Sequence, residues 1–105
     1  MNEITLFDLP GRLTLGSPVD ELQTAVVAAL RRGERSILLN CSQVAYADSS
    51  GLGQLIGSLK TVTATGGKLK LLNVGGRVEG VMRLTRCLRL FDVFDDETAA
   101  VGSFV

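Results

Sequence analysis

The alternation of apolar and polar positions divides the chain into short segments of two kinds. Apolar residues alternate with polar ones or form short runs at residues 4–9, 12–15, 36–41, 68–74 and 90–93, which predicts strands. They recur every three or four positions at residues 17–32, 49–65, 76–88 and 95–104, which predicts helices. Strands that alternate with helices indicate an α/β domain with parallel pairing at its centre.

The turn chemistry adds detail to this pattern. Pro10-Gly11 is a turn signal, so we expect the first two strands to form a hairpin. That hairpin would make the central sheet mixed, with about four to five strands and about four helices. The run at residues 36–41 is continuous enough to be buried on both faces. A length of 105 residues fits one domain, residues 1–105.

The first predicted helix has clear start and stop signals. Ser17 is placed as its N-cap and Pro18 as its first helical residue, and Gly33 is expected to end it. In the last helix, we expect Ala99, Ala100 and Phe104 to face inward.

Composition and charge exclude several classes of partner. Hydrophobic residues make up 46% of the chain, which is enough for a core and argues against disorder. Eleven basic and eleven acidic residues cancel, and no basic cluster stands out, so neither nucleic acid nor an anionic membrane is an expected partner. No apolar run approaches the roughly 20 residues of a membrane span, and the N-terminus lacks the pattern of a signal peptide. We therefore expect a cytoplasmic protein.

The two cysteines, Cys41 and Cys87, are far apart in the sequence and lie in apolar surroundings. They form neither a CxxC pair nor a metal-ligand spacing, and the chain has no histidine. We expect both to be reduced and packed in the core, with no metal and no cofactor.

Catalytic arrangements are hard to assemble from this sequence. Without histidine there is no Ser-His-Asp or Cys-His system, and Asp48 occupies the position of the first glycine of a G-x-S-x-G elbow around Ser50. Lys60, Lys68 and Lys70 are expected to be exposed rather than to activate a serine. The chain is therefore not expected to be an enzyme.

The glycines do not form a phosphate-binding loop. Gly51-Leu52-Gly53 and Gly75-Gly76 both lack the lysine and hydroxyl residue of a P-loop. Gly53 and Gly57 are four apart on one predicted helix, and close packing of that helix on the sheet is the simpler explanation.

The most informative stretch is residues 46–53, where a predicted loop enters the second helix. Asp48 or Ser49 is placed to cap this helix, Ser50 lies in its first turn, and Gly51 allows a close approach to a neighbour. Capping alone is a sufficient structural explanation. A phosphate on Ser50 would add about −1.5 to −2 charges at the positive end of the helix. With Asp48 beside it, the surface would become anionic without a change in the core, which would suit a binding switch.

These residues resemble the signature of STAS domains in bacterial anti-sigma factor antagonists. The resemblance rests on Asp48-Ser49-Ser50-Gly51-Leu52-Gly53 and on the strand before it. It extends to Gly11-Arg12-Leu13, Gly66-Gly67-Lys68-Leu69, Asn73-Val74 and residues 78–90, which is nearly the whole chain.

The resemblance implies a four-helix α/β domain that binds an anti-sigma factor with serine kinase activity. It implies that the unphosphorylated protein binds that partner and so frees a sigma factor for transcription. It also implies that the partner phosphorylates Ser50, that phosphorylation ends the binding, and that a cognate serine phosphatase restores it. The residues that it assigns to the partner-binding surface are Asp48, Ser49, Gly51, Leu52, Thr14, Ser17, Gly75 and Gly76. The family often carries an aspartate at the position of Thr14 and a proline after the strand that ends at Asn73-Val74, so these two positions bear on kinase recognition and on the start of the third helix.

Two other functions remain open from the sequence. One is a STAS-like scaffold subunit that never cycles phosphate, in a lipid-transport or stress-signalling complex. The other is a serine hydrolase, which would require Ser50 to react with a fluorophosphonate probe.

Overall fold

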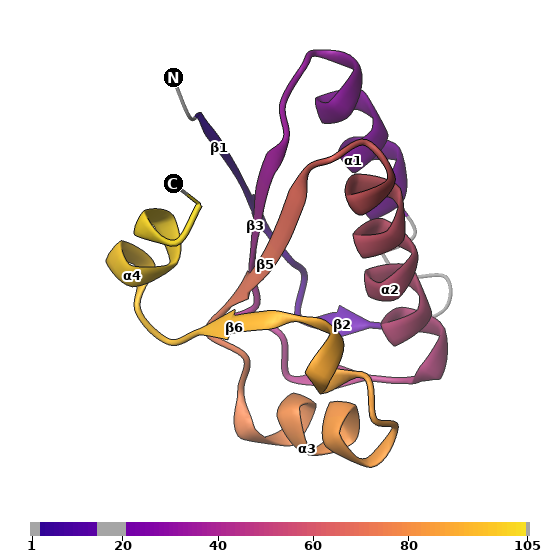
Figure 1. Ribbon diagram of the computed structural model, residues 1–105. Helices are drawn as coiled ribbons and strands as arrows, with labels where there is room; N and C mark the ends of the chain where they lie inside the picture. The colour runs from indigo at the N-terminus through magenta and orange to yellow at the C-terminus, as the bar shows by residue number, and fades with distance from the viewer. Residues whose placement is uncertain (1–2, 15–20, 105) are drawn as a thin grey trace.

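The computed structural model describes residues 3–14 and 21–104 and has the α/β architecture that the sequence predicts (Figure 1). A sheet of four parallel strands has the order β1-β3-β5-β6. Its strands are β1 (Ile4–Asp8), β3 (Ser36–Asn40), β5 (Lys68–Leu72) and β6 (Asp92–Phe94). Two shorter strands, β2 (Arg12–Leu13) and β4 (Tyr46–Ala47), pair in a second sheet.

The described residues form four α-helices around the sheet. They are α1 (Leu22–Arg31), α2 (Ser49–Ala64), α3 (Gly76–Leu84) and α4 (Glu97–Gly102), and a 3-10 turn, η2 (Leu88–Leu90), follows α3. Figure 1 shows α1 and α2 side by side on one face of the sheet, α4 on the opposite face and α3 at one end. The N-cap of the first helix that was expected at Ser17, and Pro18 after it, lie outside the described residues.

The central strands are buried on both faces, as predicted for residues 36–41. Ile37 and Leu39 pack in the larger core with α1 and α2, whereas Leu38 packs in a smaller core with Ala100 and Phe104 of the α4 segment. Both cysteines are buried and free. Ala99 is exposed, so its predicted inward orientation is wrong; α4 presents Ala100 to the sheet instead.

The predicted hairpin and mixed sheet are wrong, because every strand pair among the described residues is parallel. The chain does not reverse at Pro10-Gly11. It continues beside residues 36–47, with β1 paired to β3 and β2 paired to β4. Two hydrogen bonds bridge the gap, from Leu9 N–H to the Asn40 carbonyl (3.0 Å) and from Ala45 N–H to the Gly11 carbonyl (2.8 Å). This path carries Leu13 into the core, where it is fully buried.

Two predicted boundaries also shift near the C-terminus. The third helix ends at Leu84 rather than near Cys87, and the last strand starts at Asp92 rather than at Leu90. The reason is a left-handed residue, Arg86, which ends the helix and lets the chain form η2 before β6.

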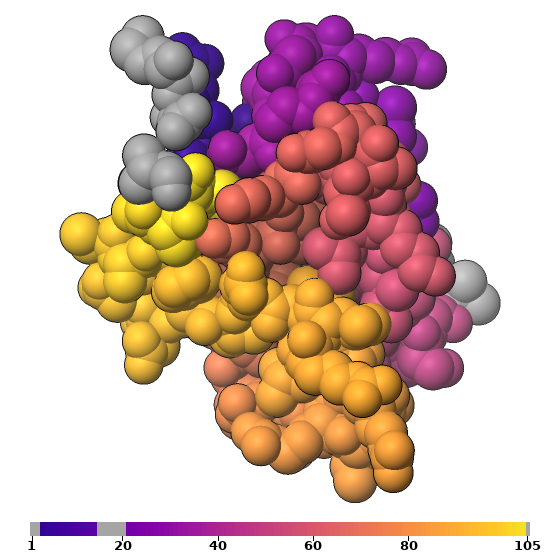
Figure 2. Space-filling model, in the orientation of Figure 1, coloured from indigo at the N-terminus to yellow at the C-terminus, as the bar shows by residue number. Residues whose placement is uncertain are grey.

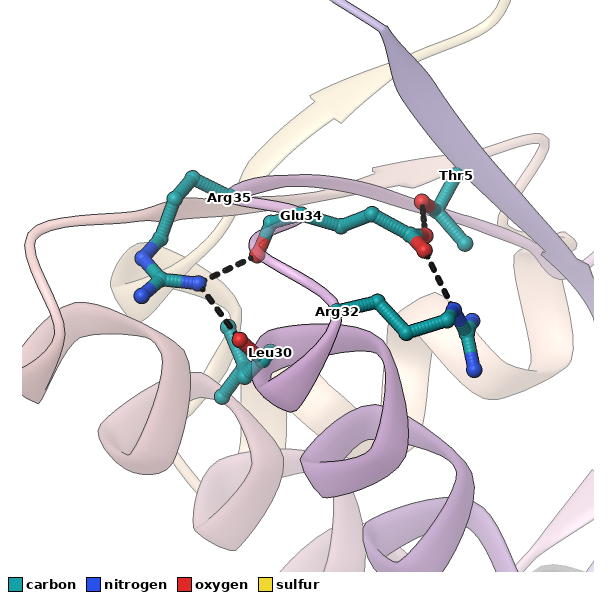
Figure 3. Close-up of polar contacts among 5 residues, drawn as sticks. All are labelled: Thr5, Leu30, Arg32, Glu34 and Arg35. Carbon is teal, nitrogen blue, oxygen red and sulfur yellow. Dashed lines mark hydrogen bonds and ion pairs between the residues drawn. The ribbon is translucent and has the colours of Figure 1, made fainter.

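A polar cluster joins the turn after α1 to the edge strand β1 (Figure 3). Glu34 accepts hydrogen bonds from the Arg32 guanidinium (2.6 Å) and from the Thr5 hydroxyl. Arg35 donates to the backbone carbonyls of Leu30 and Glu34, both at 2.8 Å. These contacts hold the entrance to β3 beside β1. Gly33, with φ of 90°, ends α1 at the predicted position.

Candidate functional site at the start of helix α2

The site is the start of helix α2, at the edge where the parallel strands end. Asp48 is the N-cap, in an extended conformation, and its carboxylate accepts a hydrogen bond from the Gly51 N–H at 2.9 Å. Of the two capping residues that the sequence allowed, the structure therefore selects Asp48. This cap fixes the first turn and uses one of the N–H groups that a helix start leaves unpaired.

Close contact with β2 holds the helix start in place. The Asp48 N–H donates to the Leu13 carbonyl at 3.1 Å. A methyl group at Gly51 would lie 1.8 Å from the same carbonyl oxygen, so only glycine fits this approach. The close approach predicted for Gly51 is therefore confirmed. The packing predicted for Gly53 and Gly57 is wrong, because Gly53 faces open space and Gly57 faces Gln23 of α1 rather than the sheet.

Ser49 and Ser50 are both exposed, while Asp48 is half-buried. Neither serine hydroxyl has a hydrogen-bond partner among the residues that the structure describes. A kinase could reach either hydroxyl, and a phosphate there would lie at the positive end of a 16-residue helix. Because no described side chain is hydrogen-bonded to Ser50 as a base, the geometry gives no support to the serine hydrolase hypothesis.

The other predicted partner-binding residues have different positions. Gly51 and Leu52 are buried, so they shape the helix start from below rather than present side chains to a partner. Thr14 is half-buried directly after β2. Gly75 and Gly76 are exposed at the start of α3, which contacts β4. Residues 14 and 48–50 follow the carboxyl ends of the paired strands β2 and β4, and residues 75–76 come after the end of β5 in the four-stranded sheet. Ser17 lies outside the described residues.

One feature of this surface is absent from the sequence predictions. The Arg12 guanidinium lies over the Tyr46 ring, 5.4 Å from its centroid, and the two residues are register partners in the β2–β4 pair. Tyr46 is 43% exposed, two residues before the helix cap. Tyrosine and arginine are the residue types that most often anchor protein interfaces. Only the correct pairing of β2 with β4 could have revealed this contact.

The described residues contain no group of three or more side chains that could hold a metal ion. None of the helices within the described ranges has the length and apolar character that a membrane crossing would need.

Comparison with known proteins identifies the family. Residues 2–100 match the model of the STAS domain. An anti-sigma-B factor antagonist of Staphylococcus aureus is 33% identical over 67 residues, which cover 64% of this chain and 62% of that protein. The alignment thus spans less than two thirds of that relative's length. The chain belongs to the STAS-domain family.

Solved structures support the same fold. The crystal structure of TM1081 from Thermotoga maritima superposes with a TM-score of 0.84 and 25% identity, over 96% of this chain and 86% of that one. The phosphorylated form of SpoIIAA, a Bacillus cell fate determinant, superposes with a TM-score of 0.74 and 22% identity, over 98% and 92%. At that identity, the likeness to SpoIIAA shows the fold alone.

Proposed function

We propose that this protein is an anti-sigma factor antagonist that is switched by phosphorylation of Ser50. In its unphosphorylated form it binds an anti-sigma factor that is also a serine kinase, and so releases a sigma factor for transcription. Phosphorylation of Ser50 by that partner ends the binding, and a cognate phosphatase restores it. The protein acts by binding alone and has no catalytic activity of its own.

The observation that carries the proposal is an exposed hydroxyl on a rigid support. Ser50 lies one residue from Gly51, whose backbone is held by the Asp48 cap and by contact with Leu13. A phosphate would therefore change the charge of the surface while the structure beneath it stays the same. The family match and the name of the staphylococcal relative agree with this role.

Electrostatic repulsion explains why a phosphate on Ser50 would weaken binding to the partner. The phosphate would be accommodated by the helix N-terminus, which favours an anion by roughly 0.3–1 kcal/mol at an exposed site. Asp48 would add a second negative group at the same surface. A like-charge juxtaposition at an interface costs several kcal/mol, and about 1.4 kcal/mol already lowers affinity tenfold. The energy available is enough to separate two proteins without unfolding either.

The test uses purified protein, ATP and candidate anti-sigma factor kinases, with the phosphate located by mass spectrometry. We expect wild type and Ser49→Ala to be modified at residue 50 and Ser50→Ala to remain unmodified. Ser49→Ala is the matched control, because both serines are exposed in the same helical turn. Full modification of Ser50→Ala would refute the assignment.

Binding provides the second readout. Ser50→Asp should lower affinity for the same partner by at least about tenfold, whereas Ser50→Ala should bind as wild type does. Equal affinity of wild type and Ser50→Asp would contradict the electrostatic mechanism. A partner that binds tightly but never modifies Ser50 would instead favour the non-cycling scaffold.

A further inference from the structure

The outer face of α3 and η2 carries an unusual concentration of positive charge around one exposed leucine. We call this the arginine surface and define it by its residues Arg77, Arg83, Leu84, Arg86 and Arg89. It projects at one end of the molecule, in orange in Figure 2. Two adjoining hollows share Arg83: one is lined by Arg77 and Leu84, the other by Arg86 and Arg89. The expectation that no basic cluster exists is therefore wrong for this face, because the helix and the turn gather arginines that are spread over 13 positions of the sequence.

Most of this charge is not neutralised. Arg83 pairs with Glu79 at 3.1 Å, one helical turn earlier. The guanidinium groups of Arg77, Arg86 and Arg89 make no hydrogen bond or ion pair with any described residue. Leu84 is 87% exposed, more than any other large apolar residue in the described chain. Arginine is enriched at protein interfaces, and here three unpaired guanidiniums lie on the same surface as the most exposed leucine.

The backbone at Arg86 gives a second, independent argument. Arg86 has φ of 61°, the left-handed conformation that glycine adopts most easily at the end of a helix. Its N–H donates to the Arg83 carbonyl at 3.1 Å and the Cys87 N–H to the Met82 carbonyl at 3.0 Å, and the Thr85 hydroxyl donates to the Val81 carbonyl at 2.9 Å, so the end of α3 is closed without the Arg86 side chain. A residue with a side chain is strained in this conformation, and the exposed Arg86 side chain forms no hydrogen bond or ion pair with a described residue that would offset the strain. Strained residues of this kind occur preferentially at functional sites.

We propose that the arginine surface is a docking site for an acidic protein segment that carries an apolar side chain. Carboxylates of that segment would accept paired hydrogen bonds from Arg77, Arg86 and Arg89, and its apolar side chain would cover Leu84. The proposal rests on residues separate from Ser50, so it stands or falls independently of the proposed phosphorylation.

The chemistry of the surface favours a protein over the two other anionic partners. A membrane is held by a broad apolar face, whereas the large apolar side chains exposed on α3 and η2 are two leucines, Leu84 and Leu90. Single-stranded nucleic acid is held by aromatic side chains on which bases stack, and the arginine surface contains none. An acidic protein segment needs only charge complementarity and one apolar contact, and both are present.

The probe is the synthetic peptide acetyl-Glu-Glu-Leu-Glu-Glu-Leu-amide, titrated into the full chain labelled with nitrogen-15. We expect chemical-shift changes to be confined to residues 76–90 and to weaken as salt is raised. A peptide with glutamine in place of glutamate should bind at least about tenfold more weakly, since it loses the charge-assisted hydrogen bonds.

Two variants make the test specific. Arg86→Gly relieves the left-handed strain, so it should fold at least as stably as wild type while binding the peptide about tenfold more weakly. Arg31→Ser removes an exposed arginine from α1 and is the matched control, for which binding should change by less than about twofold.

Three results would overturn the proposal. The first is that the peptide causes no shifts or shifts spread over the whole molecule. The second is that Arg86→Gly binds as tightly as wild type. The third is that phosphatidylserine vesicles or a single-stranded oligonucleotide bind residues 76–90 more tightly than the peptide does, which would assign the surface to another class of partner.

Discussion

Replacing Gly51 by alanine would place a methyl group against the backbone of Leu13. The new Cβ would lie 1.8 Å from the Leu13 carbonyl oxygen and 2.2 Å from its carbonyl carbon. Non-bonded atoms normally sit roughly 3.5–4.0 Å apart, so helix α2 or strand β2 would have to move by about 2 Å. Neither can move freely, because Leu13 is fully buried and its carbonyl accepts the Asp48 N–H.

The expected cost follows from this overlap. Forcing atoms into a packed core typically costs about 1–3 kcal/mol and sometimes more, and backbone atoms cannot rotate away as a side chain can. We therefore expect Gly51→Ala to lower the free energy of unfolding by about 2–3 kcal/mol and Tm by roughly 10–20 °C. Urea and thermal unfolding, followed by circular dichroism, would measure both quantities.

Gly53→Ala is the matched control in the same helix. Its methyl group would meet no atom within 4 Å, so the substitution should be neutral or stabilise by about 0.5–1 kcal/mol through helix propensity. The two substitutions should change the free energy of unfolding in opposite directions, and this difference tests the close contact between Gly51 and Leu13. If Gly51→Ala were as stable as Gly53→Ala, the packing of α2 on β2 described here would be refuted.

Three further predictions concern other parts of the domain. Burial raises the pKa of Cys41 to about 12, from a usual value of 9.0. Iodoacetamide at pH 8 should therefore label Cys41 about a thousandfold more slowly in the folded than in the unfolded protein. Mass spectrometry would measure both labelling rates, and equal rates would contradict the burial of Cys41. Hydrogen bonds from Arg32 and Thr5 lower the pKa of Glu34 below 4.5. The ionised Glu34 carboxylate therefore stabilises the folded protein above pH 4.5, and this stabilisation is lost as the pH falls below that value. Glu34→Gln should accordingly show a smaller loss of Tm on acidification than wild type, and parallel curves would exclude this contribution. Lys70 donates to the carbonyl and the hydroxyl of Ser103 at 3.0 Å, so Lys70→Ala should raise hydrogen exchange in α4, residues 97–102, and unchanged exchange there would show that the contact does not hold the helix.

The burial of Lys70 shows why some features escaped the sequence predictions. It was expected to be exposed, but it is only 6% exposed, with its ammonium 4.8 Å from the centroid of the Phe104 ring. Strand β5 places Lys70 and Leu72 on the face that α4 covers, and Leu69 and Leu71 on the opposite face. Nothing within the strand reveals that a helix 30 residues later will cover that side.

Features that depend on neighbouring residues could be predicted from the sequence alone. Asp48 caps α2 through a backbone group three residues away, Gly33 ends α1 through its own φ angle, and the spacing of apolar residues leaves Ser50 on the exposed side of its helix. Each of these features depends on residues within one or two helical turns of one another, so the order of residue types is enough to predict it.

The tertiary structure alone decided which distant segments meet. It paired β2 with β4 instead of β1, brought Arg12 over Tyr46, and gathered Arg77, Arg86 and Arg89 on one surface. The physical reason is that strand pairing and burial are set by competition among all the surfaces that the chain can cover. The burial of Leu13 beneath α2 is favoured over a hairpin turn at Pro10-Gly11. As a result, β2 lies beside β4 and supports the start of α2, where Ser50 is exposed.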